Sequence, residues 1–476
     1  MKLKIFSALL AASLALPGMA QELRSTYFMQ TSNNKHELNP ALLDQSYISM
    51  PILLGNVNLG STGNVGLENF VYKMNPDWMG YGRDGNTLTT FMHPSVDAGQ
   101  FLGDMPDKTR MNVFLKYQLF GMGFKAFGGM NSIELNLRSN VQGALPKSLF
   151  HFMKDPGAET DYTISDLGIR TENYLELGLG HAHKITDKLT VGGKVKLLFG
   201  AAYGDFKVDR LNLHLKDDYW MVDGDARLSA SLMNSTLEYE GPDKNYVDPN
   251  GQVTNRRRIK GIDEFKAGLS GFGLAFDLGA TYQVLPELTV SAALTDLGFM
   301  SWKKAHQASS AGTWRFDGFK NPIYCGGTNT GDNKLGDQFD AIGDDLENLF
   351  SVYEEDVPEK TDTRALAATL NVGAEYTLPV YRKLRFGFLY TSRICGKYSW
   401  HQGMLSATVR PINWFEATVN MAGSSTGFSG GMVLDFHARH FNFFLGTDRF
   451  FGKLSKQFIP MKNLNTNVSL GMSFPL

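Results

Sequence analysis

Cysteine is almost absent from this chain, which has only Cys325 and Cys395 among its 476 residues. One pair of thiols cannot hold a chain of this length together, so a disulfide-rich secreted scaffold is excluded. Both cysteines fall at the same expected end of the strands described below. They form a candidate disulfide that stays open at this stage, because the sequence does not show that they approach each other.

Long apolar runs are also missing beyond the first residues. Lys2 and Lys4 precede the apolar stretch Ile5–Leu16, and Gly18-Met19-Ala20 follows with the small residues of a cleavage site. This is the pattern of a secretory signal peptide over residues 1–20, so the mature chain is expected to start at Gln21. No later run reaches the 18 or so apolar residues of a membrane-crossing helix. The protein is therefore expected to be exported without a helical anchor.

No charge of one sign dominates, because 46 Lys and Arg residues stand against 48 Asp and Glu residues. This balance excludes the basic footprint of a nucleic-acid-binding protein. Nucleophile, base and orienting group never occur at a recognisable spacing, so we expect no enzymatic activity and no cofactor. His181 and His183 share one face of an expected strand, but a third metal ligand is not evident. We expect no metal site.

What the sequence does have is alternation with a period of two, repeated many times. Ile133, Leu135 and Leu137 alternate with Glu134, Asn136 and Arg138, and similar runs recur to the end of the chain. Successive strand residues face opposite sides, so each run has an apolar face and a polar or small face. A soluble β-sandwich would give the same pattern. The runs are longer than the usual 5–6 residues of soluble strands, however, and match the roughly 9–11 residues needed to cross a membrane.

Short and long connections alternate from residue 284 onward, which is typical of bacterial outer-membrane barrels. The sequence therefore predicts an all-β protein, a transmembrane antiparallel β-barrel of about 16 or 14 strands in the cell outer membrane. The expected strands lie near residues 46–61, 110–126, 131–142, 171–184, 188–204, 206–216, 220–240, 266–284, 288–302, 365–378, 384–395, 403–410, 414–422, 430–438, 441–447 and 466–474.

Two motifs resemble those of a known superfamily. Asn39-Pro40-Ala41 stands shortly after the expected mature N-terminus, and two strands carry a paired Asp-Leu-Gly, at Asp277 to Gly279 and at Asp296 to Gly298. Together they resemble FadL-like outer-membrane barrels, similar to those of the PorV and PorP/SprF type, within an uncharacterised family of unknown function. The resemblance implies a 14-stranded barrel with an N-terminal plug, or hatch, that includes Asn39, Pro40 and Ala41. The chain departs from barrels that end on an aromatic residue, since Phe474 is followed by Pro475-Leu476.

These patterns divide the chain into a signal peptide (1–20), a hatch segment (21–45) and a barrel (46–476) with a long extracellular loop at 305–364. Ten acidic residues lie between Gly331 and Lys360, and the apolar residues from Phe339 to Tyr353 follow helical spacing. An acidic amphipathic helix is expected there. Arg256-Arg257-Arg258 is expected to pair with this helix or to contact lipopolysaccharide phosphates. A second short helix is expected over residues 145–153.

Charged residues on the polar faces of the strands are expected to form a network in the lumen, because charges inside a barrel must be paired or hydrated. Asp277 and Asp296 belong to one hairpin, and Arg385 or Arg439 are their expected partners. The mixed signs favour pairing over an ion-selective pore. The expected members are Glu134, Arg138, Asp277, Asp296, Glu375, Arg385, Asp435 and Arg439.

Two functions remain open from the sequence. The first is a plugged, porin-like channel or transporter for small hydrophobic molecules, which the hatch motif favours. The second is an outer-membrane scaffold that binds partner proteins of a secretion or surface-assembly machine, which the acidic loop favours. In both cases the expected surroundings are outer-membrane lipid and lipopolysaccharide.

Overall fold

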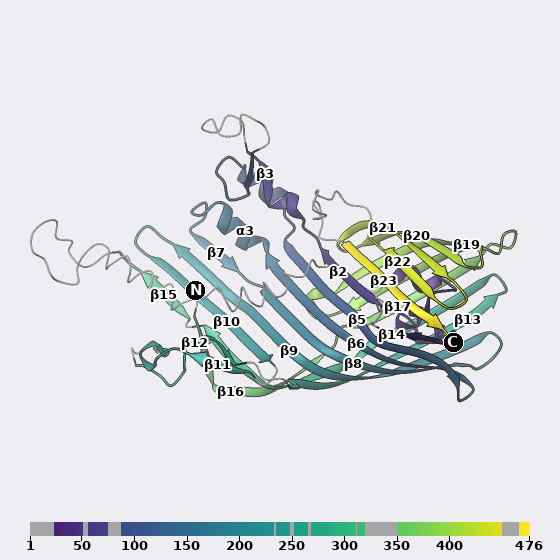
Figure 1. Cartoon of the computed structure of the whole chain (residues 1–476). Coiled ribbons are helices and arrows are strands. Elements are labelled where there is room, and N and C mark those ends of the chain that lie inside the picture. The colour runs from purple at the N-terminus through teal and green to yellow at the C-terminus, as the bar shows by residue number, and fades with distance from the viewer. Residues whose placement is uncertain are drawn as a thin grey trace, which may run out of the picture.

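Long antiparallel strands close into a cylinder in the computed structural model (Figure 1). The residues that it describes are 23–50, 56–74, 87–232, 235–247, 252–264, 268–310, 312–318, 351–449 and 466–476. In this part of the chain the barrel has 14 strand positions. In order around the wall, these positions are β1 (Tyr47–Ser49) with β2 (Val57–Gly63), β5 (Lys108–Ala126), β6 (Gly129–Pro146), β8 (Leu167–Lys184), β9 (Leu189–Leu215), β10 (Trp220–Leu232) with β13 (Gly271–Leu285), β14 (Leu288–Ser310), β16 (Val352–Ala365) with β17 (Ala368–Thr377), β18 (Leu384–Ile394), β19 (Trp400–Ile412), β20 (Phe415–Ser424), β21 (Gly427–His437), β22 (Asn442–Thr447) and β23 (Thr466–Pro475).

The barrel closes where the last strand pairs with the first position. Strand β23 forms antiparallel ladders with both β1 and β2, and these two strands pair on their other side with β5. Closure removes the open sheet edges that hydrocarbon could not satisfy. The all-β class, the antiparallel barrel and the lower of the two expected strand numbers are confirmed.

The difference between 14 and 16 strands has a local cause. Residues 188–204 and 206–216, expected as two strands, form the single 27-residue strand β9. Its upper half pairs with β10 and its lower half with β13, and both neighbours also pair with β14. β10 and β13 therefore share one position in the wall, and the chain leaves the barrel between them. This excursion carries β11 (Thr236–Tyr239), η6 (Pro242–Lys244) and β12 (Ile259–Glu264).

One wall of the barrel is much taller than the other. β5, β6, β8, β9 and β14 have 18 to 27 residues, whereas β18 to β23 have 6 to 13. About 9–11 residues suffice to cross the membrane, so the upper halves of the long strands extend past it. Figure 1 shows this extended sheet at the left. The short strands β7 (Asp161–Ile164) and β15 (Thr313–Phe316) continue it.

Apolar side chains cover the outside of the cylinder, as the alternation predicts. In β18 the side chains of Phe386 and Phe388 are 45% and 47% exposed, whereas Arg385, which faces the lumen, is 4% exposed. This is the lipid-facing and lumen-facing alternation of a transmembrane barrel. Among the described residues, no helix is long and apolar enough to cross a membrane.

A small unit with its own core stands where β2 ends, β5 begins and β6 ends. It contains η5 (Leu67–Asn69), β3 (Val71–Lys73), β4 (Leu88–Thr90), α2 (Ala98–Asp104) and α3 (Lys147–Lys154). Phe91, Phe101 and Phe150 form its buried aromatic centre, and the rings of Phe91 and Phe101 stack at 4.5 Å. Helix α3 is the short helix expected at residues 145–153.

Residues 305–310 and 352–364, which the sequence led us to expect in a loop, are strand residues of β14 and β16. The acidic helix expected from Phe339 lies mainly outside the described residues. Its last member, Tyr353, belongs to β16. Alternation in β14 is broken by bulges at Asp296 and Lys304, both with positive φ, which disguises the strand's full length.

Candidate functional site

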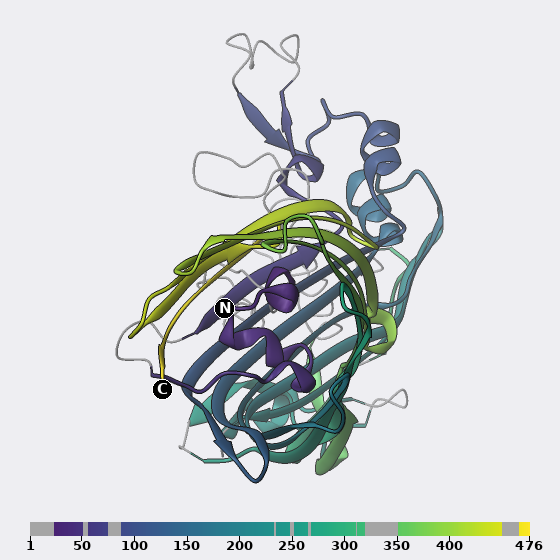
Figure 2. The same cartoon turned by 90° about the vertical axis from the view of Figure 1, so that its right-hand side faces the viewer.

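The N-terminal segment of the described chain fills the lumen of the barrel. It forms three short 3-10 helices, η1 (Arg24–Phe28), η2 (Asn33–Glu37) and η3 (Pro40–Leu42), which lie between the strands in Figure 2. Here they are called the plug. Most of its residues are polar, yet Arg24, Lys35 and Glu37 are each no more than 5% exposed. Buried polar groups need partners, so the wall around them must supply hydrogen bonds.

Two acidic residues of the wall accept hydrogen bonds from backbone N–H groups of the plug. Asp448 accepts from the backbone nitrogens of Arg24 at 2.6 Å and Ser25 at 3.0 Å. Glu416 accepts from the backbone nitrogens of Gln30 at 3.1 Å and Thr31 at 2.9 Å. The first N–H groups of a helix have no partner within it, which applies to Arg24 and Ser25, while Gln30 and Thr31 lie between two helices. In both places the carboxylates replace the water that would otherwise bind these N–H groups.

Donor side chains of the wall satisfy the carbonyl groups of the plug in the same way. Arg385 donates to the carbonyl oxygen of Phe28 at 2.7 Å, and Asn371 donates to that of Leu38 at 2.9 Å. Arg385 also pairs with Glu416 and, at 3.3 Å, with Glu375. This arginine therefore holds two acidic residues and the plug together.

Two ionisable side chains of the plug join the lumen network directly. His36 Nε2 lies 2.5 Å from Glu134, whose other oxygen accepts from Lys194 at 2.8 Å. Glu37 pairs with Lys116 at 2.8 Å. All of these side chains are at least 93% buried. The plug and the wall thus share one buried polar network.

Asn39-Pro40-Ala41 forms the start of η3 in the plug. The Asn39 side chain caps η3 by accepting from the Ala41 nitrogen at 3.0 Å and donates to the Tyr27 hydroxyl at 3.0 Å. Pro40 stands at the first helical position, where its missing N–H costs nothing. Burial raises the pKa of Tyr27.

Two glycines of the wall make room for this turn. Gly192 of β9 and Gly279 of β13 face each other across the strand pair. A Cβ atom on Gly192 would lie 2.3 Å from the Pro40 carbonyl carbon, and one on Gly279 would lie 2.0 Å from Asn39 Oδ1. Glycine is required at both positions because the plug backbone approaches the sheet directly.

Asp277 and Asp296 lie in the lumen, but their partners differ from those expected. Lys196 contacts Asp277 at 2.7 Å and Asp296 at 2.6 Å, and Arg138 contacts Asp296 at 3.3 Å. Arg385 is occupied by Glu416 and Glu375. The expected pairing across the bore was wrong because charged residues on adjacent strands reach each other first, and Lys196 of β9 lies diagonally across from Asp277 on β13, two residues from Lys194, which is the register partner of Asp277.

The remaining expected members of the network are divided. Glu134, Arg138 and Glu375 join it, with Arg138 Nε 2.8 Å from Glu176 Oε2. Asp435 is fully buried beside Glu416, its cross-strand neighbour. Arg439 is exposed in the turn between β21 and β22, outside the lumen, because the strand ends at His437.

Several lumen residues escaped the sequence analysis. Asp448 follows the end of β22 and is not part of an alternating run. Arg24 lies in the plug, which has no periodic pattern. Lys116 and Arg393 do lie in strands where apolar and polar residues alternate, so their place among the polar, lumen-facing positions could have identified them.

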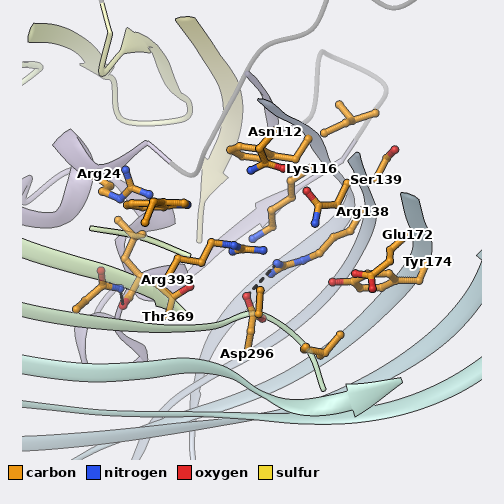
Figure 3. A pocket seen from close by; sticks show the side chains of 18 residues that line it. Arg24, Asn112, Lys116, Arg138, Ser139, Glu172, Tyr174, Asp296, Thr369 and Arg393 are labelled. Atoms are coloured by element: carbon orange, nitrogen blue, oxygen red, sulfur yellow. Dashed lines mark hydrogen bonds and ion pairs between the residues drawn. The ribbon is translucent and has the colours of Figure 1, made fainter. Parts of the chain in front are cut away.

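A cavity lies in the lumen beside the plug, with a free volume of about 70 Å³. That is room for a few water molecules. Figure 3 shows four cationic side chains around it, Arg24, Lys116, Arg138 and Arg393, and two acidic ones, Glu172 and Asp296. Apolar groups line the remainder, among them Leu38, Phe114, Tyr174, Leu366 and Trp400.

Cys395 directly follows β18, with its sulfur 3.8 Å from the Gln142 amide nitrogen. Cys325 is outside the described residues, so the disulfide stays a prediction. His181 and His183 stack with ring centroids 5.8 Å apart near the turn after β5. No group of three or more His, Cys, Asp or Glu in the described ranges could hold a metal ion.

The arginine cluster of the excursion binds acidic residues of its surroundings. Arg257 pairs with Glu354 of β16 at 2.8 Å, and Arg258 lies 3.6 Å from Glu240. Tyr239 also donates to Glu354 at 2.8 Å. The excursion is therefore fastened to β16, at the acidic stretch that was expected to form the helix.

The toluene transporter TbuX of Ralstonia pickettii aligns at 10% identity over 96% of this chain and 95% of its own, with a TM-score of 0.42. The toluene transporter TodX of P. putida aligns at 8% identity over 92% of each chain, with a TM-score of 0.39. No curated protein matches the sequence. A model of the family of unknown function DUF5723 matches residues 40–448. The chain, a plugged 14-stranded barrel, therefore belongs to the DUF5723 family.

Proposed function

We propose that this protein is an outer-membrane channel that its own N-terminal plug keeps closed, and that small hydrophobic molecules pass when the plug moves. The observation that carries the proposal is the way the plug is held. Its backbone is fixed mainly by hydrogen bonds to side chains of the wall, at Asp448, Glu416, Arg385 and Asn371. Water can replace each such bond at a net cost of about 0.5–1.5 kcal/mol, or about 1.5–3 kcal/mol where a charged group takes part.

The apolar surfaces near the plug support a hydrophobic cargo. Leu38 of the plug packs with Leu389 and Met404 of the wall. Further along the lumen, Tyr203 stacks on Trp302 at 5.1 Å, next to Leu198 and Met300. A molecule that separates plug from wall would meet these side chains in succession. Outside the barrel, the apolar band is proposed to contact outer-membrane lipid and the acyl chains of lipopolysaccharide.

Uptake of N-phenylnaphthylamine tests the proposal, because an intact lipopolysaccharide layer excludes this small apolar fluorophore. Cells that display the full chain in their outer membrane are expected to take the fluorophore up faster than cells without it. A variant lacking residues 23–43 should additionally admit small sugars, since the wall then encloses open water. Equal uptake with and without the protein, with the barrel folded by its heat-shifted gel mobility, would contradict the channel.

The extracellular unit favours a second function, a scaffold for partner proteins. The unit has its own aromatic core of Phe91, Phe101 and Phe150, separate from the lumen. A channel does not need such a unit, whereas a binding platform does. Purification in mild detergent is expected to retain a stoichiometric partner if the protein is a scaffold, such as a component of a secretion machine. Replacing residues 64–107 with a short Gly-Ser linker should then release the partner while leaving fluorophore uptake unchanged.

A further inference from the structure

Arg393 differs from the other cationic residues around the lumen cavity. Lys116 pairs with Glu37 at 2.8 Å, Arg138 pairs with Glu176 at 2.8 Å, and Arg24 lies over the Trp400 ring at 4.4 Å. The Arg393 side chain makes neither an ion pair nor a hydrogen bond with any described residue. Its Nε atom is buried without a partner. Figure 3 shows the guanidinium group reaching toward Arg138 and Lys116.

This arrangement has an unfavourable free energy when no anion is bound. A guanidinium group presents five N–H donors and cannot lose its charge. Burying part of it without partners has an unfavourable free energy, and two further cations on the same cavity add repulsion. Glu172 lines the cavity as well, yet it forms no ion pair with Arg393. Glu172 and Asp296 interact with Arg393 electrostatically, but neither lies within ion-pair distance of its guanidinium group, and the buried Nε atom has no hydrogen-bond acceptor among the described residues.

We propose that the cavity binds the oxyanion of a small solute, a carboxylate or a phosphate, between Arg393, Arg138 and Lys116. Planar guanidinium groups match the two oxygens of such anions with paired hydrogen bonds. Phe114, Tyr174 and Leu366 line the same cavity and would contact an apolar part of the solute. This inference rests on the proposed function, because it takes the cavity as a binding site for the transported molecule. It adds to that function that the hydrophobic molecule carries a negatively charged group.

Binding to the closed, full-length protein in dodecyl maltoside tests the inference, with isothermal titration calorimetry as the readout. Benzoate and neutral benzamide share one shape, and inorganic phosphate has no apolar part. Benzoate is expected to bind at least about tenfold more tightly than benzamide, since a hydrogen bond to a charged group favours it. Binding of benzoate but not phosphate assigns the site to organic acids, and binding of phosphate alone assigns it to free anions. Equal affinity for benzoate and benzamide together with no binding of phosphate would overturn the proposal.

Substitution of Arg393 separates recognition from structure. Arg393→Gln is expected to weaken benzoate or phosphate binding about tenfold or more, while Arg393→Lys retains part of the affinity. In the absence of anions, Arg393→Gln should leave the unfolding temperature unchanged or raise it, because it removes a partly buried guanidinium group that has no hydrogen-bond acceptor. The control is Arg210→Gln, which removes an exposed arginine paired with Asp223 far from the cavity. Unchanged binding in Arg393→Gln, or a lowered unfolding temperature, would contradict an anion site.

The calorimetric experiment and the fluorophore-uptake experiment test the anion site and the channel independently. Anion binding is measured without any transport, so binding of benzoate without fluorophore uptake would support the anion site and contradict the channel. Fluorophore uptake without binding of either anion would support the channel and contradict the anion site.

Discussion

Gly192→Val is expected to open the barrel. The new side chain would begin 2.3 Å from the carbonyl carbon of Pro40, a distance that neither backbone can accept. Strand β9 is held on both sides by continuous ladders, whereas the plug is held by separate side-chain contacts. The plug will therefore move. Overpacking costs about 1–3 kcal/mol, which shifts the ratio of open to closed plug by about 5- to 150-fold.

Single-channel recording in planar bilayers measures this effect as the fraction of time spent conducting. Gly193→Val is the matched control, because a Cβ atom there meets nothing closer than 3.7 Å and the residue faces away from the plug. Both variants add the same side chain to neighbouring positions of one strand. If both conduct as rarely as the natural protein, the plug does not close the lumen by its contact with Gly192.

Lys196→Met is expected to destabilise the barrel by about 3–5 kcal/mol. Lys196 is the shared partner of Asp277 and Asp296, at 2.7 and 2.6 Å, and only 2% of its side chain is exposed. Methionine preserves the volume but leaves two buried carboxylates facing each other. Arg138 still reaches Asp296 at 3.3 Å, but no arginine or lysine other than Lys196 contacts Asp277 among the described residues. Urea unfolding of the protein in lipid vesicles measures the loss.

Lys184→Met provides the comparison, since that lysine is 62% exposed and pairs with Asp187 at the surface. Exposed pairs of this kind contribute about 0–1 kcal/mol. Adding Asp277→Asn to Lys196→Met should recover much of the loss, because it removes the carboxylate left without a counter-charge. A loss below 1 kcal/mol in the single variant would mean that water already hydrates these carboxylates in the lumen.

The sequence alone determined the fold class. Period-two alternation depends only on which side chains lipid and water accept, so a closed barrel could be predicted strand by strand at Phe386 to Tyr390 and elsewhere. The polar phase also placed Glu134, Arg138, Asp277 and Asp296 in the lumen, because side-chain direction follows directly from position in a strand.

Only the tertiary structure decided which charges meet and where strands begin and end. Arg439 was expected in the lumen but lies in a turn, because the alternating pattern continues past the last ladder bond at His437. β10 and β13 share one position because their neighbours β9 and β14 span both halves, and this pairing is not a property of either segment. Gly192 and Gly279 look like ordinary small strand residues until Asn39 and Pro40 lie against them. Contacts between segments far apart in the chain depend on register and closure, which local patterns do not encode.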